Sequence, residues 1–183
     1  MRATASTSAG LAHLTLDDLA AESYDALGAR YATGLVPPTR IKALDGALTG
    51  RMLAVRGLGR PPLALLQKAL TRFAASPSFP WEGKSFQSEG PDHGTGVNRV
   101  NMPRLLGRPS LFPFTTHLGP SLIDGEPAVI LDYDLPENPA YIRRVHDELR
   151  LVGAGLFLGP AMWKATAGGA VTILWFAVDA GPP

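Results

Sequence analysis

The apolar run 127–135 contains two carboxylates and a phenol, those of Asp132, Asp134 and Tyr133. If the run is a strand, its alternation places Asp132 and Asp134 on one face and Tyr133 on the other. Two carboxylates beside an apolar cavity raise each other's pKa, so that Asp132 could serve as a general acid or base. The phenol of Tyr133 could hydrogen-bond a bound carbonyl group. Alternatively, the acidic face meets solvent at the end of the strand and Tyr133 belongs to the core.

A second polar pair, Asn98 and Arg99, lies in the glycine-rich segment 94–100. These glycines precede neither a helical pattern nor a GK[ST] motif, so a phosphate-binding loop is not indicated. As a strand, the segment could direct Asn98 or Arg99 into the interior of a barrel, where either would bind a carboxylate or an enolate. The alternative is an edge strand whose arginine is solvated.

Few other residues are candidates for chemistry. The four histidines are widely spaced and form no metal-binding motif. His117 lies in an apolar run and is the best placed of them for proton transfer. The chain has no cysteine, no G-x-S-x-G elbow and no dinucleotide-binding fingerprint. These absences disfavour nucleophilic hydrolysis and nicotinamide or flavin chemistry, and we expect neither a metal nor another cofactor.

The secondary structure predicted to position these residues is helical in the first part of the chain and extended in the rest. In the first part, capping residues and apolar spacing predict helices over 15–33, 39–48 and 61–77. A short extended piece is predicted at 51–55. The first part of the chain is therefore expected to be mainly helical.

From Trp81 onward, glycine and proline separate short apolar runs that are typical of strands. The six predicted strands are 81–87, 95–102, 111–118, 127–135, 155–163 and 170–179. A single helix, over 141–149 with Asn138 as its cap, is predicted to interrupt them. Strands in this meander order favour an antiparallel sheet that curls into a barrel.

The predicted fold is therefore α+β, with N-terminal helices packed against an antiparallel β-barrel as one unit. We expect a flexible tail over residues 1–14 and a single domain over 15–183. The helical part of this domain covers 15–77, and its β-barrel part covers 81–179.

The composition disfavours some classes of partner and location. With 17 basic and 16 acidic residues the net charge is +1, which argues against nucleic-acid binding. No apolar run approaches the roughly 18 residues of a membrane span. The first residues lack the continuous apolar stretch of a secretory signal. We therefore expect no membrane span and a cytoplasmic protein.

Two motifs in the chain resemble those of a known group of proteins. Residues 81–86 are WEGKSF, and residues 144–150 are RVHDELR, followed by GLFLG at 155–159. They are similar to motifs of small calycin-like proteins of bacteria, in which a W-x-GK-x-F strand opens a β-barrel and a DELR…GLYLG segment leads into the closing strands. The resemblance covers residues 81–178. It implies a lipocalin-like barrel that holds an apolar ligand such as a fatty acid, an isoprenoid or a polyketide.

Three functional hypotheses remain open for such a barrel. In the first, it binds a hydrophobic small molecule, and a set of interior side chains contacts the ligand: Asn98, Phe114, Phe157, Trp163 and Trp175. In the second, it is a cofactor-independent cyclase, isomerase or lyase that acts by positioning and water exclusion. Its acid, base or oxyanion groups would then be Asp132, Tyr133, Arg99 and His117. In the third, it is an interaction module whose N-terminal helices cover the barrel mouth or pair with a second subunit, as in a homodimer.

Overall fold

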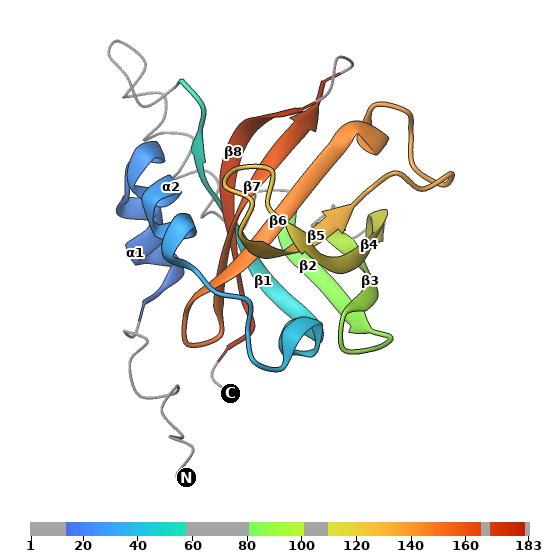
Figure 1. Cartoon of the computed structure of the whole chain (residues 1–183), viewed down its shortest axis with the longest axis horizontal. Coiled ribbons are helices and arrows are strands. Elements are labelled where there is room, and N and C mark those ends of the chain that lie inside the picture. The colour runs from blue at the N-terminus through green and yellow to red at the C-terminus, as the bar shows by residue number, and fades with distance from the viewer. Residues whose placement is uncertain (1–13, 58–80, 101–109, 166–168, 182–183) are drawn as a thin grey trace, which may run out of the picture.

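The structure is a computed structural model that describes residues 14–57, 81–100, 110–165 and 169–181. Eight strands form a closed barrel in which each strand pairs antiparallel with the next and β8 pairs with β1 (Figure 1). The strands are β1 (Gly46–Val55), β2 (Trp81–Ser88), β3 (His93–Val100), β4 (Ser110–Pro120), β5 (Pro127–Asp132), β6 (Val145–Gly153), β7 (Leu156–Lys164) and β8 (Ala170–Asp179). The predicted antiparallel β-barrel is confirmed, and the six predicted strands correspond to β2, β3, β4, β5, β7 and β8.

The helix predicted over 141–149 is wrong. Only Ile142–Arg144 form a 3-10 turn, η3, and Val145 then begins strand β6, which pairs with β5 and β7. Asn138, the expected cap, instead donates hydrogen bonds to two backbone carbonyls. The strand prevails over the local helical signal because a barrel without it would leave the edges of β5 and β7 unpaired.

The N-terminal part contains two short helices, α1 (Leu16–Ala21) and α2 (Tyr24–Thr33), where the sequence predicts one helix over 15–33. The division falls at Ser23, whose hydroxyl accepts a hydrogen bond from an amide in the first turn of α2 and so starts a second helix. Within the residues that the structure describes, no helix is long and apolar enough to cross a membrane.

The helix predicted over 39–48 is reduced to the 3-10 helix η1 (Arg40–Leu44), because β1 begins at Gly46. Gly46 takes a φ of 111° at this junction, a backbone conformation that glycine adopts readily. β1 includes the extended piece predicted at 51–55, so the segment expected to be helical supplies one strand of the barrel. The helix predicted over 61–77 lies outside the described residues.

The barrel wall separates two hydrophobic cores. The interior core consists of Ile41, Leu44, Leu48, Phe86, Phe114, Val129, Leu131, Tyr133, Leu149, Phe157, Phe176 and Val178. Two of these come from η1, the light-blue turn at the lower end of the strands in Figure 1, which fills that end of the barrel. The outer core joins α1 and α2 to β1, β7 and β8, through residues that include Leu27, Leu53, Leu158, Trp175 and Ala177.

Candidate functional site

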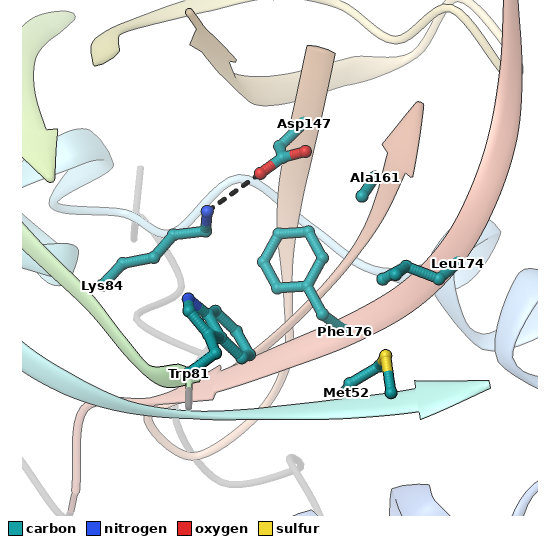
Figure 2. A pocket seen from close by; sticks show the side chains of 7 residues that line it. All are labelled: Met52, Trp81, Lys84, Asp147, Ala161, Leu174 and Phe176. Atoms are coloured by element: carbon teal, nitrogen blue, oxygen red, sulfur yellow. Dashed lines mark hydrogen bonds and ion pairs between the residues drawn. The ribbon is translucent and has the colours of Figure 1, made fainter. Parts of the chain in front are cut away.

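A cavity of about 220 Å³ lies inside the barrel, toward the end at which β1 and β7 finish and β2 and β8 begin. Seven residues from five strands line it: Met52, Trp81, Lys84, Asp147, Ala161, Leu174 and Phe176 (Figure 2). Five of these residues are hydrophobic, and the two charged ones form an ion pair with each other. The cavity is therefore an apolar space with one charged pair in its wall.

Strand alternation explains why Lys84 and Asp147 point inward. Lys84 lies two residues before Phe86 of the interior core, and Asp147 lies two residues before Leu149 of the same core. Side chains two positions apart on a strand share a face. Lys84 and Asp147 therefore point into the barrel, on the same strand faces as Phe86 and Leu149. Lys84 is only 2 % exposed and Asp147 only 3 %.

The ammonium group of Lys84 has a full set of hydrogen-bond acceptors. Its Nζ donates to Asn98 Oδ1 at 2.9 Å, to Tyr133 Oη at 2.5 Å and to Asp147 Oδ2 at 2.9 Å. Tyr133 Oη in turn donates to the same carboxylate oxygen at 3.0 Å. Trp81 Nε1 donates to Asn98 Oδ1 at 3.2 Å. These side chains form one connected polar cluster inside the barrel, which we call the Lys84 cluster.

Four aromatic rings surround the same nitrogen. Lys84 Nζ lies 5.0 Å from the ring centre of Phe176, 5.2 Å from Phe114, 5.3 Å from Tyr133 and 5.6 Å from Trp81. Ring faces attract a cation, so the rings of Phe176, Phe114 and Trp81 add to the stabilisation by the carboxylate. Tyr133 contacts the nitrogen through its hydroxyl group instead. The rings also keep water from the nitrogen, so the charge is held without solvation.

Burial changes the proton affinities of this cluster in opposite directions. It lowers the pKa of Lys84, and the opposing effect of the Asp147 carboxylate does not compensate. Burial raises the pKa of Tyr133, and the charge of Asp147 raises it further, against a smaller lowering by the Asn98 hydrogen bond. Desolvation penalises the charged form of each group. Lys84 therefore releases a proton more readily than an ordinary lysine, whereas Tyr133 keeps its proton.

One oxygen of the cluster has no hydrogen-bond partner among the described residues. Asp147 Oδ1 is buried and unpaired, although Oδ2 accepts two hydrogen bonds. In Figure 2 this second oxygen points away from Lys84, on the side of Ala161. A buried carboxylate oxygen without a donor is costly. A ligand with a hydroxyl or amine donor in the cavity could satisfy it.

The structure brings some of the predicted site residues together at this cluster. Asn98 and Tyr133 belong to the hydrogen-bond network, and Phe114 provides one of the four rings. Phe157 lies in the interior core but does not line the cavity. Trp163 is close to one end of the barrel, where the guanidinium of Arg144 lies 5.0 Å from the centre of its ring.

Other predicted site residues lie elsewhere. Asp132 faces outward, opposite in direction to Tyr133, and pairs with Lys164 at 2.9 Å. His117 is exposed, and Arg99 donates to the carbonyl oxygen of Leu48 at 2.9 Å. Trp175 packs on the outside of the barrel, against two tyrosines of α2. The proposed carboxylate pair of Asp132 and Asp134 is not at the cavity, because alternation turns that face of β5 away from the interior.

Sequence reasoning missed Lys84 and Asp147. Lys84 lies in the WEGKSF motif, where alternation with Phe86 could have indicated an inward lysine. Asp147 was hidden by the helix predicted over 141–149, which places its carboxylate on a solvated face. Only the pairing of β6 between β5 and β7 turns it toward Lys84, across 63 positions of sequence.

A second buried carboxylate, that of Glu148, lies on the outer face of β6 and links it to α2. Its Oε2 accepts from Tyr31 Oη at 2.5 Å, and its Oε1 accepts from the Leu122 amide at 2.7 Å and lies 3.1 Å from His146 Nε2. Burial alone would raise the pKa of Glu148, but these hydrogen bonds, together with one from Ser121, outweigh burial and lower it. Glu148 therefore stabilises the attachment of α2 while it is ionised.

We expect the stability of the protein to fall in acid partly through Glu148. A carboxyl group whose pKa is lowered by folding binds fewer protons in the folded state than in the unfolded state. Its stabilising contribution is therefore complete above the ordinary pKa of 4.5 and is lost as the pH falls below that value. The variant Glu148→Gln should show a smaller loss of urea midpoint between about pH 6 and about pH 4 than the wild type. An unchanged pH dependence in this variant would contradict the assignment.

No protein-family model matches the chain, and no characterised protein or solved structure matches it significantly. In the described part of the chain, no three histidine or acidic side chains gather in a way that could hold a metal ion. The interpretation of the cavity therefore depends on its own geometry and chemistry.

Proposed function

We propose that the protein binds a small hydrophobic molecule inside a calycin-like barrel, with a polar group of that molecule at the Lys84 cluster. The observation that carries this proposal is an apolar cavity with a single buried ion pair in its wall. Cavities that bind small molecules are mostly apolar and hold a few convergent polar groups that orient the ligand. Asp147 Oδ1, which has no hydrogen-bond partner among the described residues, would accept a hydrogen bond from a hydroxyl or amine group of the ligand.

The volume of the cavity limits the size of what it can enclose. At about 220 Å³ it exceeds the roughly 150 Å³ of an engineered apolar cavity that takes up benzene. It is smaller than the roughly 300 Å³ at which pockets for drug-sized ligands begin. A molecule of about ten non-hydrogen atoms suits this space. A fatty acid, an isoprenoid or a polyketide would insert only one end.

We expect filling the cavity to abolish binding without unfolding the barrel. Ala161 lines the cavity opposite Asp147 in the β6–β7 register, so Ala161→Phe places a ring in the space of the ligand. Isothermal titration of 3-phenylpropanol, an apolar alcohol of suitable size, should show binding to the wild type and an affinity lower by about tenfold or more in this variant. The matched control is Ala32→Phe, because Ala32 is exposed on α2. Equal affinity in all three proteins would place the binding site elsewhere.

A second candidate function is a cofactor-independent enzyme acting on the same kind of molecule, such as an isomerase, a cyclase or a lyase. The observation that favours it is the 2.5 Å contact between Lys84 Nζ and Tyr133 Oη, which pairs a base of lowered pKa with a buried proton donor. Such pairs are common in acid–base catalysis. Of the four catalytic residues predicted from sequence, only Tyr133 takes part in this proposal.

A further inference from the structure

We propose that Lys84 forms a covalent, protonated imine with the carbonyl group of an apolar aldehyde or ketone bound in the cavity. This inference rests on the proposed function, because it needs an apolar molecule in the same space. It adds the chemical class of the ligand and the atom to which the ligand becomes attached.

The position of the nitrogen suits this reaction. Lys84 lines the cavity together with hydrophobic residues of β1, β7 and β8. A ligand whose apolar part lies against Met52 and Leu174 would bring its carbonyl carbon to Nζ in place of one of the three acceptors that Nζ contacts. Figure 2 shows the side chain extending into the interior toward Asp147. A bound carbonyl would thus be held next to the amine, which makes addition effectively intramolecular.

The surroundings of Lys84 suit a protonated imine as well as they suit an ammonium. A protonated imine keeps the positive charge, so the Asp147 carboxylate keeps its counter-ion and the rings of Trp81, Phe114 and Phe176 keep their cation. Its nitrogen has one hydrogen to donate instead of three, and Asp147 Oδ2 can accept it. The two acceptors given up by Lys84 keep other donors: Asn98 Oδ1 accepts from Trp81 Nε1, and Tyr133 Oη accepts from Asn98 Nδ2. Neither of these two acceptors is therefore left without a donor.

The same groups can carry the protons of the reaction. The ammonium first gives a proton to the Asp147 carboxylate, and the neutral amine attacks the carbonyl carbon, so that a C–N bond forms and one proton passes from the nitrogen to the oxygen. The carbinolamine then loses that oxygen as water as the C–O bond breaks, with the second proton returned by Asp147. The net change is an ammonium and a carbonyl compound going to a protonated imine and water, with no oxidation or reduction. The lowered pKa of Lys84 favours the first step.

The other two lysines that the structure describes lack this setting. The chain has four, Lys42, Lys68, Lys84 and Lys164. Lys42 is exposed on η1, and Lys164 is one-third exposed and paired with Asp132 on the outer surface. Solvated lysines remain protonated near neutral pH. Selective reaction at Lys84 under these conditions would therefore report its buried position.

The experiment treats the full chain with 3-phenylpropanal and sodium cyanoborohydride, which reduces an imine to a stable amine, at about neutral pH, where ordinary lysines are protonated. Peptide mapping should show an adduct at Lys84 and none at Lys42 or Lys164; the α-amino group of the chain, which is partly unprotonated at this pH, is also labelled and is counted separately. The variant Lys84→Arg should lose the adduct, and Lys164→Arg should keep it. An excess of 3-phenylpropanol should protect Lys84 in the wild type, a measurement that needs no variant to fold.

The outcomes separate this inference from the proposed function. If 3-phenylpropanol binds in the cavity but the aldehyde gives no adduct at Lys84, the imine is overturned and the binding function stands. If Lys84 is labelled no faster than Lys42 and Lys164, the imine is likewise overturned. If the alcohol does not bind and does not protect Lys84, the proposed function itself fails. A single, protectable adduct at Lys84 supports both.

Discussion

Replacing Asp147 by asparagine should lower the free energy of unfolding by about 3–5 kcal/mol, because removal of one partner of a buried ion pair leaves the other charge uncompensated. Lys84 and Asp147 are both almost fully buried, so water cannot take the place of the lost carboxylate. Urea denaturation of the purified variant measures this loss. The double variant Lys84→Met/Asp147→Leu, which removes both charges and keeps similar volume, should recover most of the stability.

The sign of the pH dependence gives an independent check. Folding lowers the pKa of Lys84, so the unfolded state binds more protons than the folded state between the lowered pKa and the ordinary value of 10.5. Stability therefore rises with pH in this window. Without Asp147 the pKa of Lys84 falls further, and the deficit of Asp147→Asn relative to the wild type should shrink as the pH is raised.

A surface ion pair provides the matched control. Asp132 pairs with Lys164 at the same 2.9 Å, but both side chains are more than one-third exposed. The variant Asp132→Asn should lose only about 0–1 kcal/mol, as is typical of exposed pairs. Equal losses in Asp147→Asn and Asp132→Asn would contradict a buried, energetically coupled site at Lys84.

The second large effect is expected at Gly159, where any side chain would collide with the neighbouring strand. A Cβ atom at this position would lie 1.6 Å from the carbonyl oxygen of Glu148 and 2.8 Å from its carbonyl carbon. Because these atoms belong to the backbone of β6, the clash is relieved only by moving β6 and β7 apart. Gly159→Ala should therefore cost about 3 kcal/mol or more, at the upper end of overpacking effects, and thermal unfolding measures it.

The same substitution on a helix should act in the opposite direction. Gly28 lies in α2, and a Cβ there would meet the Trp175 ring at 3.4 Å, an ordinary contact. Gly28→Ala should stabilise the protein by about 0.5–1 kcal/mol, because alanine is the better helix former. A loss at Gly159 no larger than the change at Gly28 would mean that β6 and β7 are less closely packed than described. Their close approach matters for the site, because it holds Asp147 opposite Ala161 in the cavity wall.

The alternative functions make different demands on these residues. A container for an apolar molecule needs the cavity volume, and Ala161→Phe tests it directly. Formation of an imine needs the amine of Lys84 as well as the cavity volume. A pure interaction module needs neither, and its partner surface would lie outside the barrel. The ion pair and the apolar cavity adjoin each other inside the barrel, and this is the observation on which the proposed binding function rests.

Local pattern in the sequence was enough to predict the type of most strands. Alternation and turn residues indicate β2, β3, β4, β5, β7 and β8, and the same alternation correctly separates Asp132 from Tyr133. Thr15 and Ser23 cap helices as their types predict, although the division into two helices was missed. These features depend on neighbours within a few residues, and a single sequence contains that information.

Only the tertiary structure decided which face of each strand points inward and what lies across from it. β6 has a helical local pattern and becomes a strand because β5 and β7 need a partner between them. Closure of the barrel then brings Asp147 to Lys84 and turns Asp132 and Trp175 outward. The site depends on contacts between residues distant in sequence, and a register shift by one residue would reverse every one of these orientations.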